Sequence, residues 1–340
     1  MASQSSTSTI RFSRARLSPI IPRTPGTFYS VHVANPDLLL FKGKVHLYFR
    51  GQAEPGYDQI GVAYATPEAF DGVHWEMCAD NPVISVSRNR ADFDSGYILD
   101  PAAIAVDNRV YLYYSAHRYD WQNWNIPSHI GLAISDDGTH FSKYVDNPII
   151  EGTAPEIVWH KNRLVLFFQK RTPEGNFNIY CCPGRDAFHF EPELAVTVFG
   201  PSKQPGAFDS YSISTVRIFR EHDWFYMFYG GCDRFFDYPC AIGLARSRNL
   251  LEWERYPGNP VFERGEAGTW DEGALWFATV YKEGNTYFMW YEGTGTGLGL
   301  DSPEARAASR LAVDEDYGGY RTTSFSQIGL AVFERSSLAW

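Results

Sequence analysis

The sequence has few cysteines, no long apolar run and no excess of basic residues. Its 5 cysteines (Cys78, Cys181, Cys182, Cys232 and Cys240) are an odd number without metal-ligand spacing, which favours buried reduced thiols over disulfides or a zinc site. No apolar run approaches membrane-spanning length. The first ten residues lack the basic and apolar regions of a secretory signal. We therefore expect a cytoplasmic protein.

The charge balance argues against another group of partners. The 30 Lys and Arg residues are outnumbered by 40 Asp and Glu, which gives a formal net charge of −10. Nucleic acids and anionic membranes bind surfaces where Lys and Arg cluster, so we expect neither as a partner. No nucleotide, flavin or haem motif is present, and we expect no organic cofactor and no metal ligands.

What the sequence does contain is a fivefold repeat. Each unit continues, at a constant offset from its opening, into an aromatic-rich strand, and aromatic residues make up 16% of the chain. The openings are Asn35-Pro36-Asp37-Leu38, Asp100-Pro101-Ala102-Ala103, Ala154-Pro155-Glu156-Ile157, Thr215-Val216-Arg217-Ile218 and Phe277-Ala278-Thr279-Val280. Their spacing of roughly 55 to 65 residues is near the range typical of propellers and solenoids. We predict an all-β fold, a five-bladed β-propeller formed by residues 1–340 as one domain.

The two ends of the chain predict how the ring closes. The fifth unit ends after its third strand, whereas residues 12–21 (FSRARLSPII) closely match residues 141–150 (FSKYVDNPII) of the second unit. We predict that the N-terminal segment supplies the fourth strand of the last blade, which removes an exposed sheet edge. A second motif, Phe93-Asp94, Phe208-Asp209 and Trp270-Asp271, recurs upstream of three openings. We expect these aspartates to be structural, satisfying backbone donors between blades.

Three openings carry a carboxylate at nearly the same place, namely Asp37, Asp100 and Glu156. The first strand of each propeller blade lines the central channel, so these side chains should face one cavity. Like charges held close together push pKa values apart, so that one carboxyl stays protonated while another ionises. Cleavage of a glycosidic bond needs such a pair. We predict a catalytic trio.

Other polar and aromatic residues are candidates for contacts with a sugar. Strand ends beside the openings carry several of them, and others stand at the expected mouth of the cavity. These predicted substrate-binding residues are Asn35, Arg50, His117, Gln169, Tyr211, Glu272, Trp276 and Glu292. Two long loops, 116–129 with Trp121 and Trp124 and 293–326 with a predicted helix near 303–313, are candidate lids or interfaces. The 293–326 insertion is our candidate surface for a second copy of the chain.

Taken together, these openings resemble those of the five-bladed propeller glycosidases, the superfamily that includes glycoside hydrolase families 32, 43, 62, 68, 117 and 130. In family 43 an Asp of blade one is the base, an Asp of blade two orients, and a Glu of blade three is the acid. The resemblance implies these roles for Asp37, Asp100 and Glu156, and it allows a calcium ion on the axis. Three positions depart from the patterns: Asn35 stands where family 43 has Asp, Glu156 follows Pro155 instead of preceding a Pro, and Ala102 stands where family 130 has Arg.

The resulting functional hypothesis is a glycoside hydrolase that removes a terminal sugar from a short oligosaccharide or glycoside, with inversion. Inversion predicts that the Asp37 and Glu156 carboxyls lie roughly 6.5–9.5 Å apart, and retention about 5–5.5 Å. The alternative enzyme is a glycoside phosphorylase, with Arg50 and other basic residues holding phosphate. The third hypothesis is a non-catalytic sugar-binding propeller, in which the trio is far apart or salt-bridged.

Overall fold

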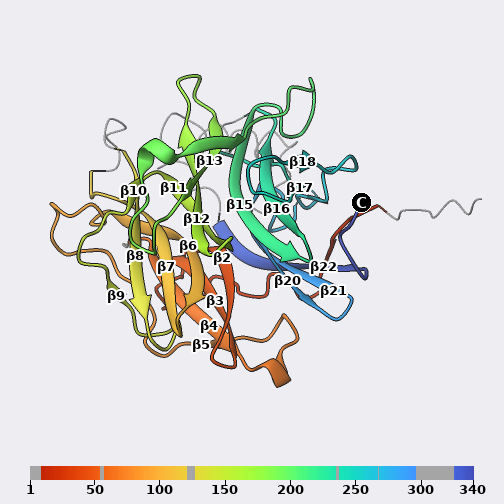
Figure 1. The fold of residues 1–340 in the computed structure, drawn as a ribbon. Coiled ribbons are helices and arrows are strands. Elements are labelled where there is room, and N and C mark those ends of the chain that lie inside the picture. The colour runs from red at the N-terminus through yellow and green to blue at the C-terminus, as the bar shows by residue number, and fades with distance from the viewer. Residues whose placement is uncertain (1–8, 54–56, 121–126, 235–236, 267, 296–324) are drawn as a thin grey trace, which may run out of the picture.

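The computed structural model describes residues 9–53, 57–120, 127–234, 237–266, 268–295 and 325–340. Over these ranges the chain forms strands and two short 3₁₀ helices, η1 (Pro67–Ala69) and η2 (Pro192–Leu194), and no α-helix (Figure 1). None of its described helices is long and apolar enough to cross a membrane. Trp121, Trp124 and nearly all of the 293–326 insertion, with its predicted helix and interface, lie outside the described residues.

The strands form five antiparallel sheets of four or five strands. Blade 1 contains β2 (His32–Phe41), β3 (Lys44–Gln52), β4 (Gln59–Ala65) and β5 (Glu76–Met77). Blade 2 contains β6 (Tyr97–Val106), β7 (Arg109–His117), β8 (His129–Ser135), β9 (Ser142–Lys143) and β10 (Ile150–Glu151). Blade 3 contains β11 (Thr153–His160), β12 (Arg163–Arg171), β13 (Phe177–Pro183) and β14 (Val196–Phe199).

Two further blades complete the ring. Blade 4 contains β15 (Ser212–Glu221), β16 (Trp224–Cys232), β17 (Ala241–Ser247), β18 (Glu254–Arg255) and β19 (Phe262–Glu263). Blade 5 contains β20 (Ala274–Glu283), β21 (Thr286–Gly295), β22 (Phe325–Glu334) and β1 (Ser13–Arg14). The inner strands β2, β6, β11, β15 and β20 neighbour one another in this order, and β20 returns to β2 around the middle of the molecule (Figure 1). The predicted five-bladed propeller is confirmed.

Each inner strand is interrupted by a β-bulge at the same place in the repeat. The register slips between Ala34 and Asp37 in β2, and at the equivalent point of the other four inner strands. The first bulged residue has a positive φ in every blade: Asn35 (52°), Asp100 (57°), Ala154 (50°), Thr215 (48°) and Phe277 (48°). These are the residues that open the five repeat units in the sequence, so the repeat marks a recurring backbone bend.

The N-terminal segment closes the ring as predicted. β1 pairs with β22, with Ser13 opposite Val332 and Arg14 opposite Ala331. The aspartates of the second repeated motif join the strands of blades 2, 4 and 5 in the same way, and we call this arrangement a lock. Each aspartate accepts one hydrogen bond from a tyrosine hydroxyl of the second strand and one from a basic side chain of an outer strand. The sets are Asp94–Tyr114–Lys143, Asp209–Tyr229–Arg255 and Asp271–Tyr291–Arg14. These aspartates are structural, and side chains supply the donors where the sequence predicted backbone groups.

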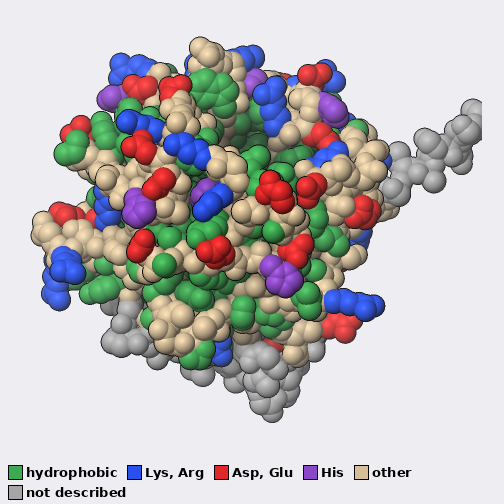
Figure 2. Space-filling view, turned by 90° about the horizontal axis from the view of Figure 1, so that it is seen from below, with side chains coloured by type: hydrophobic (Ala, Val, Ile, Leu, Met, Phe, Trp, Pro, Cys, Tyr) green, Lys and Arg blue, Asp and Glu red, His purple; other side chains and the backbone are tan. Residues whose placement is uncertain are grey.

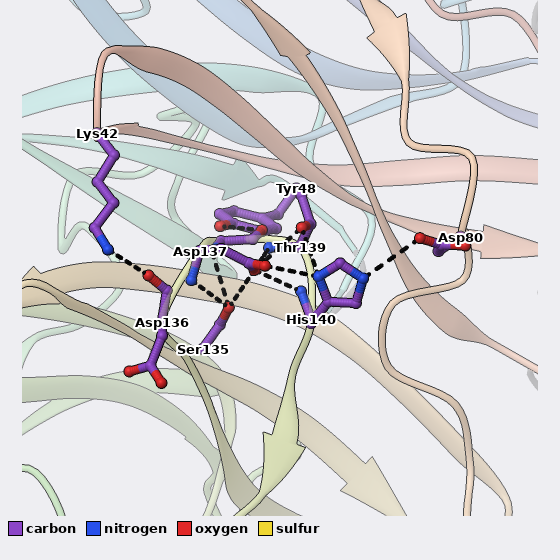
Figure 3. Close-up of polar contacts among 9 residues, drawn as sticks. Lys42, Tyr48, Asp80, Ser135, Asp136, Asp137, Thr139 and His140 are labelled. Carbon is purple, nitrogen blue, oxygen red and sulfur yellow. Dashed lines mark hydrogen bonds and ion pairs between the residues drawn. The ribbon is translucent and has the colours of Figure 1, made fainter.

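Aromatic and aliphatic side chains pack in the spaces between neighbouring blades, and hydrogen bonds between turns also join the blades. At the junction of blades 1 and 2, Lys42 donates to the Asp136 carbonyl at 2.7 Å and the Tyr48 hydroxyl to the Gly138 carbonyl at 3.0 Å (Figure 3). His140 lies between Asp137, 2.7 Å away, and Asp80, 3.4 Å away (Figure 3). Acidic, basic and histidine side chains are interspersed with apolar ones over the face in Figure 2. None of the five cysteines forms a disulfide bond.

Candidate functional site

Two rings of side chains surround the propeller axis. The first, which we call the bulge ring, consists of the positive-φ residues Asn35, Asp100, Ala154, Thr215 and Phe277. The second, which we call the inner ring, lies two residues further along each inner strand and consists of Asp37, Ala102, Glu156, Arg217 and Thr279. Every member of both rings is buried. The three carboxylates predicted from the sequence therefore belong to different rings: Asp100 to the first, and Asp37 and Glu156 to the second.

Arg217 of blade 4 crosses the axis and contacts the other four blades. Its guanidinium donates to three backbone carbonyls, those of Pro36 (3.4 Å), Pro155 (3.0 Å) and Pro101 (2.7 Å). On blade 5 the ring of Phe277 covers it, with its centroid 4.6 Å from the guanidinium carbon. The residue is 2% exposed. Arg217 thus forms the floor beneath the bulge ring.

Asp37 and Glu156 are ion-paired with this arginine. An Asp37 oxygen lies 3.5 Å and a Glu156 oxygen 3.3 Å from the guanidinium nitrogens. The second oxygen of each accepts a backbone N–H of the next blade, from Ala103 at 2.7 Å and from Ile218 at 3.0 Å. Burial raises the pKa of both carboxyls, and Arg217 opposes the rise. This geometry ties blades together, and the catalytic roles of Asp37 and Glu156 stay predictions.

The oxygen atoms around Arg217 are of the kind that calcium prefers, since carboxylate and backbone carbonyl oxygens are its usual protein ligands. Here the carbonyls of Pro36, Pro101 and Pro155 and the carboxylates of Asp37 and Glu156 are already engaged by the guanidinium. A calcium ion does not fit this donor set while Arg217 occupies it. The positive charge at this level of the axis is therefore supplied by the chain itself.

Asp100 stands apart from this ion-paired floor. Its carboxylate accepts the Thr153 hydroxyl at 3.4 Å, and that hydroxyl lies 3.0 Å from the Ser115 hydroxyl. Burial raises the pKa of Asp100 to about 7, against the opposing effects of Ser115, Arg50 and Arg217. A carboxyl that holds its proton near neutral pH can donate it to a leaving oxygen.

Glu292 and Asn35 join the site from blades 5 and 1. One Glu292 oxygen accepts both the backbone N–H and the side-chain amide of Asn35, each at 3.2 Å. The amide oxygen of Asn35 is buried and has no hydrogen-bond partner among the described residues. Burial raises the pKa of Glu292, while Arg50 opposes the rise. An unpartnered acceptor beside the Glu292 carboxyl is suited to receive a hydroxyl group.

Arg50 provides the positive charge at this level. It pairs with buried Asp58 at 2.8 Å, and its charge partly offsets the rise that burial causes in the pKa of Asp100 and of Glu292.

Two more predicted residues hold the bulges of blades 4 and 5. Trp276 donates its indole N–H to Asp237 at 3.1 Å. Gln169 accepts the Thr215 N–H at 3.0 Å, which fixes the bulge of blade 4.

The remaining predicted residues have contacts within their own blades. Tyr211 is exposed, and its backbone N–H donates to Cys232. Glu272 is buried and accepts the Gly268 N–H at 2.6 Å. His117 is buried, stacks on Tyr97, and lies 3.2 Å from the Arg118 carbonyl. The structure therefore brings Asn35, Arg50, Asp100, Gln169, Trp276 and Glu292 to the bulge ring or beside it, whereas these contacts of Tyr211, Glu272 and His117 lie within their own blades.

The sequence analysis missed Arg217, Asp58 and Asp237. Arg217 had a visible signal, because it occupies the repeat position of Asp37 and Glu156, where one cation opposite two acids predicts an ion-paired cluster. Asp58 and Asp237 lie in the segments between β3 and β4 and between β16 and β17, outside the repeated motifs. Nothing in their local sequence separates them from ordinary loop aspartates.

Comparison with known proteins supports the fold. No family model matches the chain, and no curated protein matches it in sequence. Among solved structures, a β-1,2-mannobiose phosphorylase from Listeria innocua superposes with a TM-score of 0.67 at 13% identity, over 95% of this chain and 96% of the other. A glycosyl hydrolase from Bacteroides ovatus gives 0.65 at 15% identity, over 97% and 95%. An N-acetylgalactosamine deacetylase from F. plautii gives 0.65 at 14% identity, over 95% of both.

These similarities extend over nearly the whole chain, and their low identities make them evidence of fold. They agree with the resemblance seen in the repeat openings. The chain therefore shares its five-bladed propeller fold with these solved structures.

Proposed function

We propose that this protein is a glycoside hydrolase that acts at the bulge ring, with Asp100 as the proton donor. The supporting observation is the convergence of Asp100, Glu292 and Asn35 from three blades onto one end of the axis, in a fold shared with sugar-processing enzymes. Asp100 holds its proton near neutral pH because it is buried. The substrate class is a short oligosaccharide or glycoside with an exposed terminal sugar, in line with the expectation from the sequence.

The same residues favour water over phosphate as the second substrate. A phosphate site needs unpaired cationic or N–H donors. Arg50 is paired with Asp58, and Arg217 with Asp37 and Glu156. Asp100 and Glu292 add two acidic groups at the same level. A phosphorylase therefore has weaker support, despite the fold shared with the mannobiose phosphorylase.

A non-catalytic sugar-binding propeller is the second candidate, and one observation favours it. The sequence analysis predicts that in such a protein the trio is salt-bridged, and Asp37 and Glu156 are ion-paired with Arg217. Asp100 forms no such ion pair within the described part of the chain, which is why we place the chemistry there. Under this alternative the protein binds sugars and releases no product.

The test is an NMR assay with pentofuranosides, fructosides, galactosides and mannosides, with and without phosphate. We expect free sugar without phosphate, and the anomer formed first distinguishes inversion from retention. Asp100→Asn should lower kcat by about 100-fold or more, and wild-type activity should decline above about pH 7 as Asp100 loses its proton. The exposed Asp136→Asn variant serves as the control (Figure 3).

Glu156→Gln separates the site proposed here from the sequence-derived one. If Glu156→Gln folds and abolishes activity while Asp100→Asn remains active, Glu156 is the acid and Asp37 the base, as first predicted. Sugar 1-phosphate formed only with phosphate would establish a phosphorylase. Sugar binding without any product would establish the non-catalytic propeller.

A further inference from the structure

Asp237 lies where blades 4 and 5 meet, close to the bulge ring. One of its oxygens accepts two side-chain donors, the Ser214 hydroxyl at 2.6 Å and the Trp276 indole N–H at 3.1 Å. Ser214 and Trp276 directly precede the bulge-ring residues Thr215 and Phe277. The carboxylate is therefore held at the level of Asp100, on the other side of the ring.

Its charge reaches the two carboxyls already assigned to the site. Asp237 raises the pKa of both Asp100 and Glu292, in each case as a smaller effect than burial. The three acidic groups come from blades 2, 4 and 5. Two hydrogen-bond donors on one oxygen stabilise the negative charge of Asp237.

Access distinguishes Asp237 from Glu292 as a partner for Asp100. Glu292 is 3% exposed, and one of its oxygens is occupied by both donors of Asn35. Asp237 is half-buried, in the segment that connects β16 to β17. Incoming water can approach Asp237 from solvent, whereas one Glu292 oxygen is occupied by Asn35, and we assign Glu292 to orienting that residue.

We propose that Asp237 is the second catalytic carboxylate, the base that activates water opposite the proton donor Asp100. This inference rests on the proposed hydrolase function. In the step, the Asp100 carboxyl gives its proton to the glycosidic oxygen as the bond from that oxygen to the anomeric carbon breaks. A water oxygen bonds to the anomeric carbon and passes one proton to Asp237. The two protonation states are then restored through solvent.

The first test is Asp237→Asn, which keeps an acceptor for Ser214 and Trp276 and removes the charge. We expect kcat to fall by about 100-fold or more, with KM changed by less than threefold, an unchanged Tm, and loss of the acidic limb of the pH profile. The control is Asp233→Asn, because Asp233 lies in the same segment and its ion pair within the described part of the chain is the local one with Arg234 at 3.2 Å. That variant should retain wild-type kinetics.

A second measurement separates a base from a residue that only fixes Ser214 and Trp276. Asp237→Ala should regain activity with added azide and release a glycosyl azide, which a merely structural role does not predict. If Asp237→Asn retains activity while Asp100→Asn is inactive, Asp237 is not the base although the hydrolase function stands. If wild-type protein hydrolyses nothing in the glycoside panel, the proposed function fails and this inference fails with it.

The pairing itself can be tested without turnover. The carboxyl ¹³C signal of Asp100 should titrate at lower pH in Asp237→Asn than in the wild type, because a neighbouring negative charge has been removed. An unchanged titration would mean that the two groups do not interact, and the proposal would be wrong.

Discussion

At the scale of single residues, the bulge ring combines strained backbone conformations with a buried acidic side chain, and both of these lower the stability of the fold. All five members adopt the left-handed region, which Asn and Asp tolerate but which is costly for Thr and Phe, by about 1–3 kcal/mol each. One member, Asp100, is also a buried acid whose pKa is raised to about 7. Such strained and poorly solvated groups tend to cluster at functional sites.

Asp100→Asn should stabilise the protein at high pH. The pKa of Asp100 is about 7 in the folded state against its ordinary value of 3.8 in the unfolded chain, so the unfolded state releases its proton first as pH rises. The stability contributed by this group is complete below about pH 3.8 and is lost through about pH 7. We expect the variant to gain roughly 4 kcal/mol over wild type at pH 8 and less than about 1 kcal/mol at pH 4.

Denaturant unfolding at both pH values measures this difference. Asp80→Asn is the control, because the Asp80 side chain is 70% exposed. An equal effect of Asp100→Asn at pH 4 and pH 8 would contradict the raised pKa.

At the scale of elements, the two-residue strand β1 completes blade 5 from the opposite end of the chain. Its pairing with β22 alone is short, and Arg14 adds an ion pair with buried Asp271 at 2.6 Å. Lys143–Asp94 and Arg255–Asp209 occupy equivalent places in blades 2 and 4. The N-terminal segment therefore reproduces the lock that blades with a continuous outer strand possess.

Arg14→Ala should weaken this closure. It leaves the Asp271 carboxylate buried without its cationic partner, and because Arg14 is itself about a third exposed, we expect a loss of about 1–2 kcal/mol. The matched control is Arg11→Ala, whose pair with Glu263 is more than half exposed on both sides. It should cost about 0–1 kcal/mol.

Chemical denaturation and amide hydrogen exchange of β22 report this prediction. Faster exchange in β22 for Arg14→Ala alone would support the lock. Equal losses in the two variants would show that the ion pair with Asp271 has no special role in closure.

At the scale of the whole molecule, Arg217 joins the five blades at the axis. It contacts blades 1, 2 and 3 through carbonyl oxygens, blades 1 and 3 also through carboxylates, and blade 5 through Phe277. Arg217→Met would leave two buried carboxylates without their counter-ion. We expect a loss of about 3–5 kcal/mol, whereas Arg220→Met, at an exposed position of the same strand, should have little effect.

The same arrangement predicts how the protein responds to a chelator. Because the guanidinium already engages the axial oxygens, the Tm of the wild type should be the same in EDTA and in millimolar calcium. A lower Tm in EDTA would show that a metal ion contributes to the fold at a site other than the one filled by Arg217.

The sequence by itself determined the architecture of this protein, because every blade of a propeller has the same strand order and the same bulge in its inner strand. The openings at Asn35, Asp100, Ala154, Thr215 and Phe277 predicted five blades, and the match between residues 12–21 and 141–150 predicted the closing strand. Both patterns are visible in the sequence because each blade has the same backbone bend and packs the same kinds of side chain against the next blade. The aspartates of the Phe-Asp and Trp-Asp motifs were assigned as structural on the same ground.

Only the tertiary structure decided which carboxylates face which partners at the axis. Asp37 and Asp100 lie two positions apart in the aligned openings, and the structure places them in successive rings, one against Arg217 and the other against Ser115 and Thr153. Asp237 comes from a segment outside the repeats and meets the ring through Ser214 and Trp276. Contacts around the axis join residues from 23 to 257 positions apart, and ion pairing there depends on ångström-scale geometry that a linear pattern does not encode.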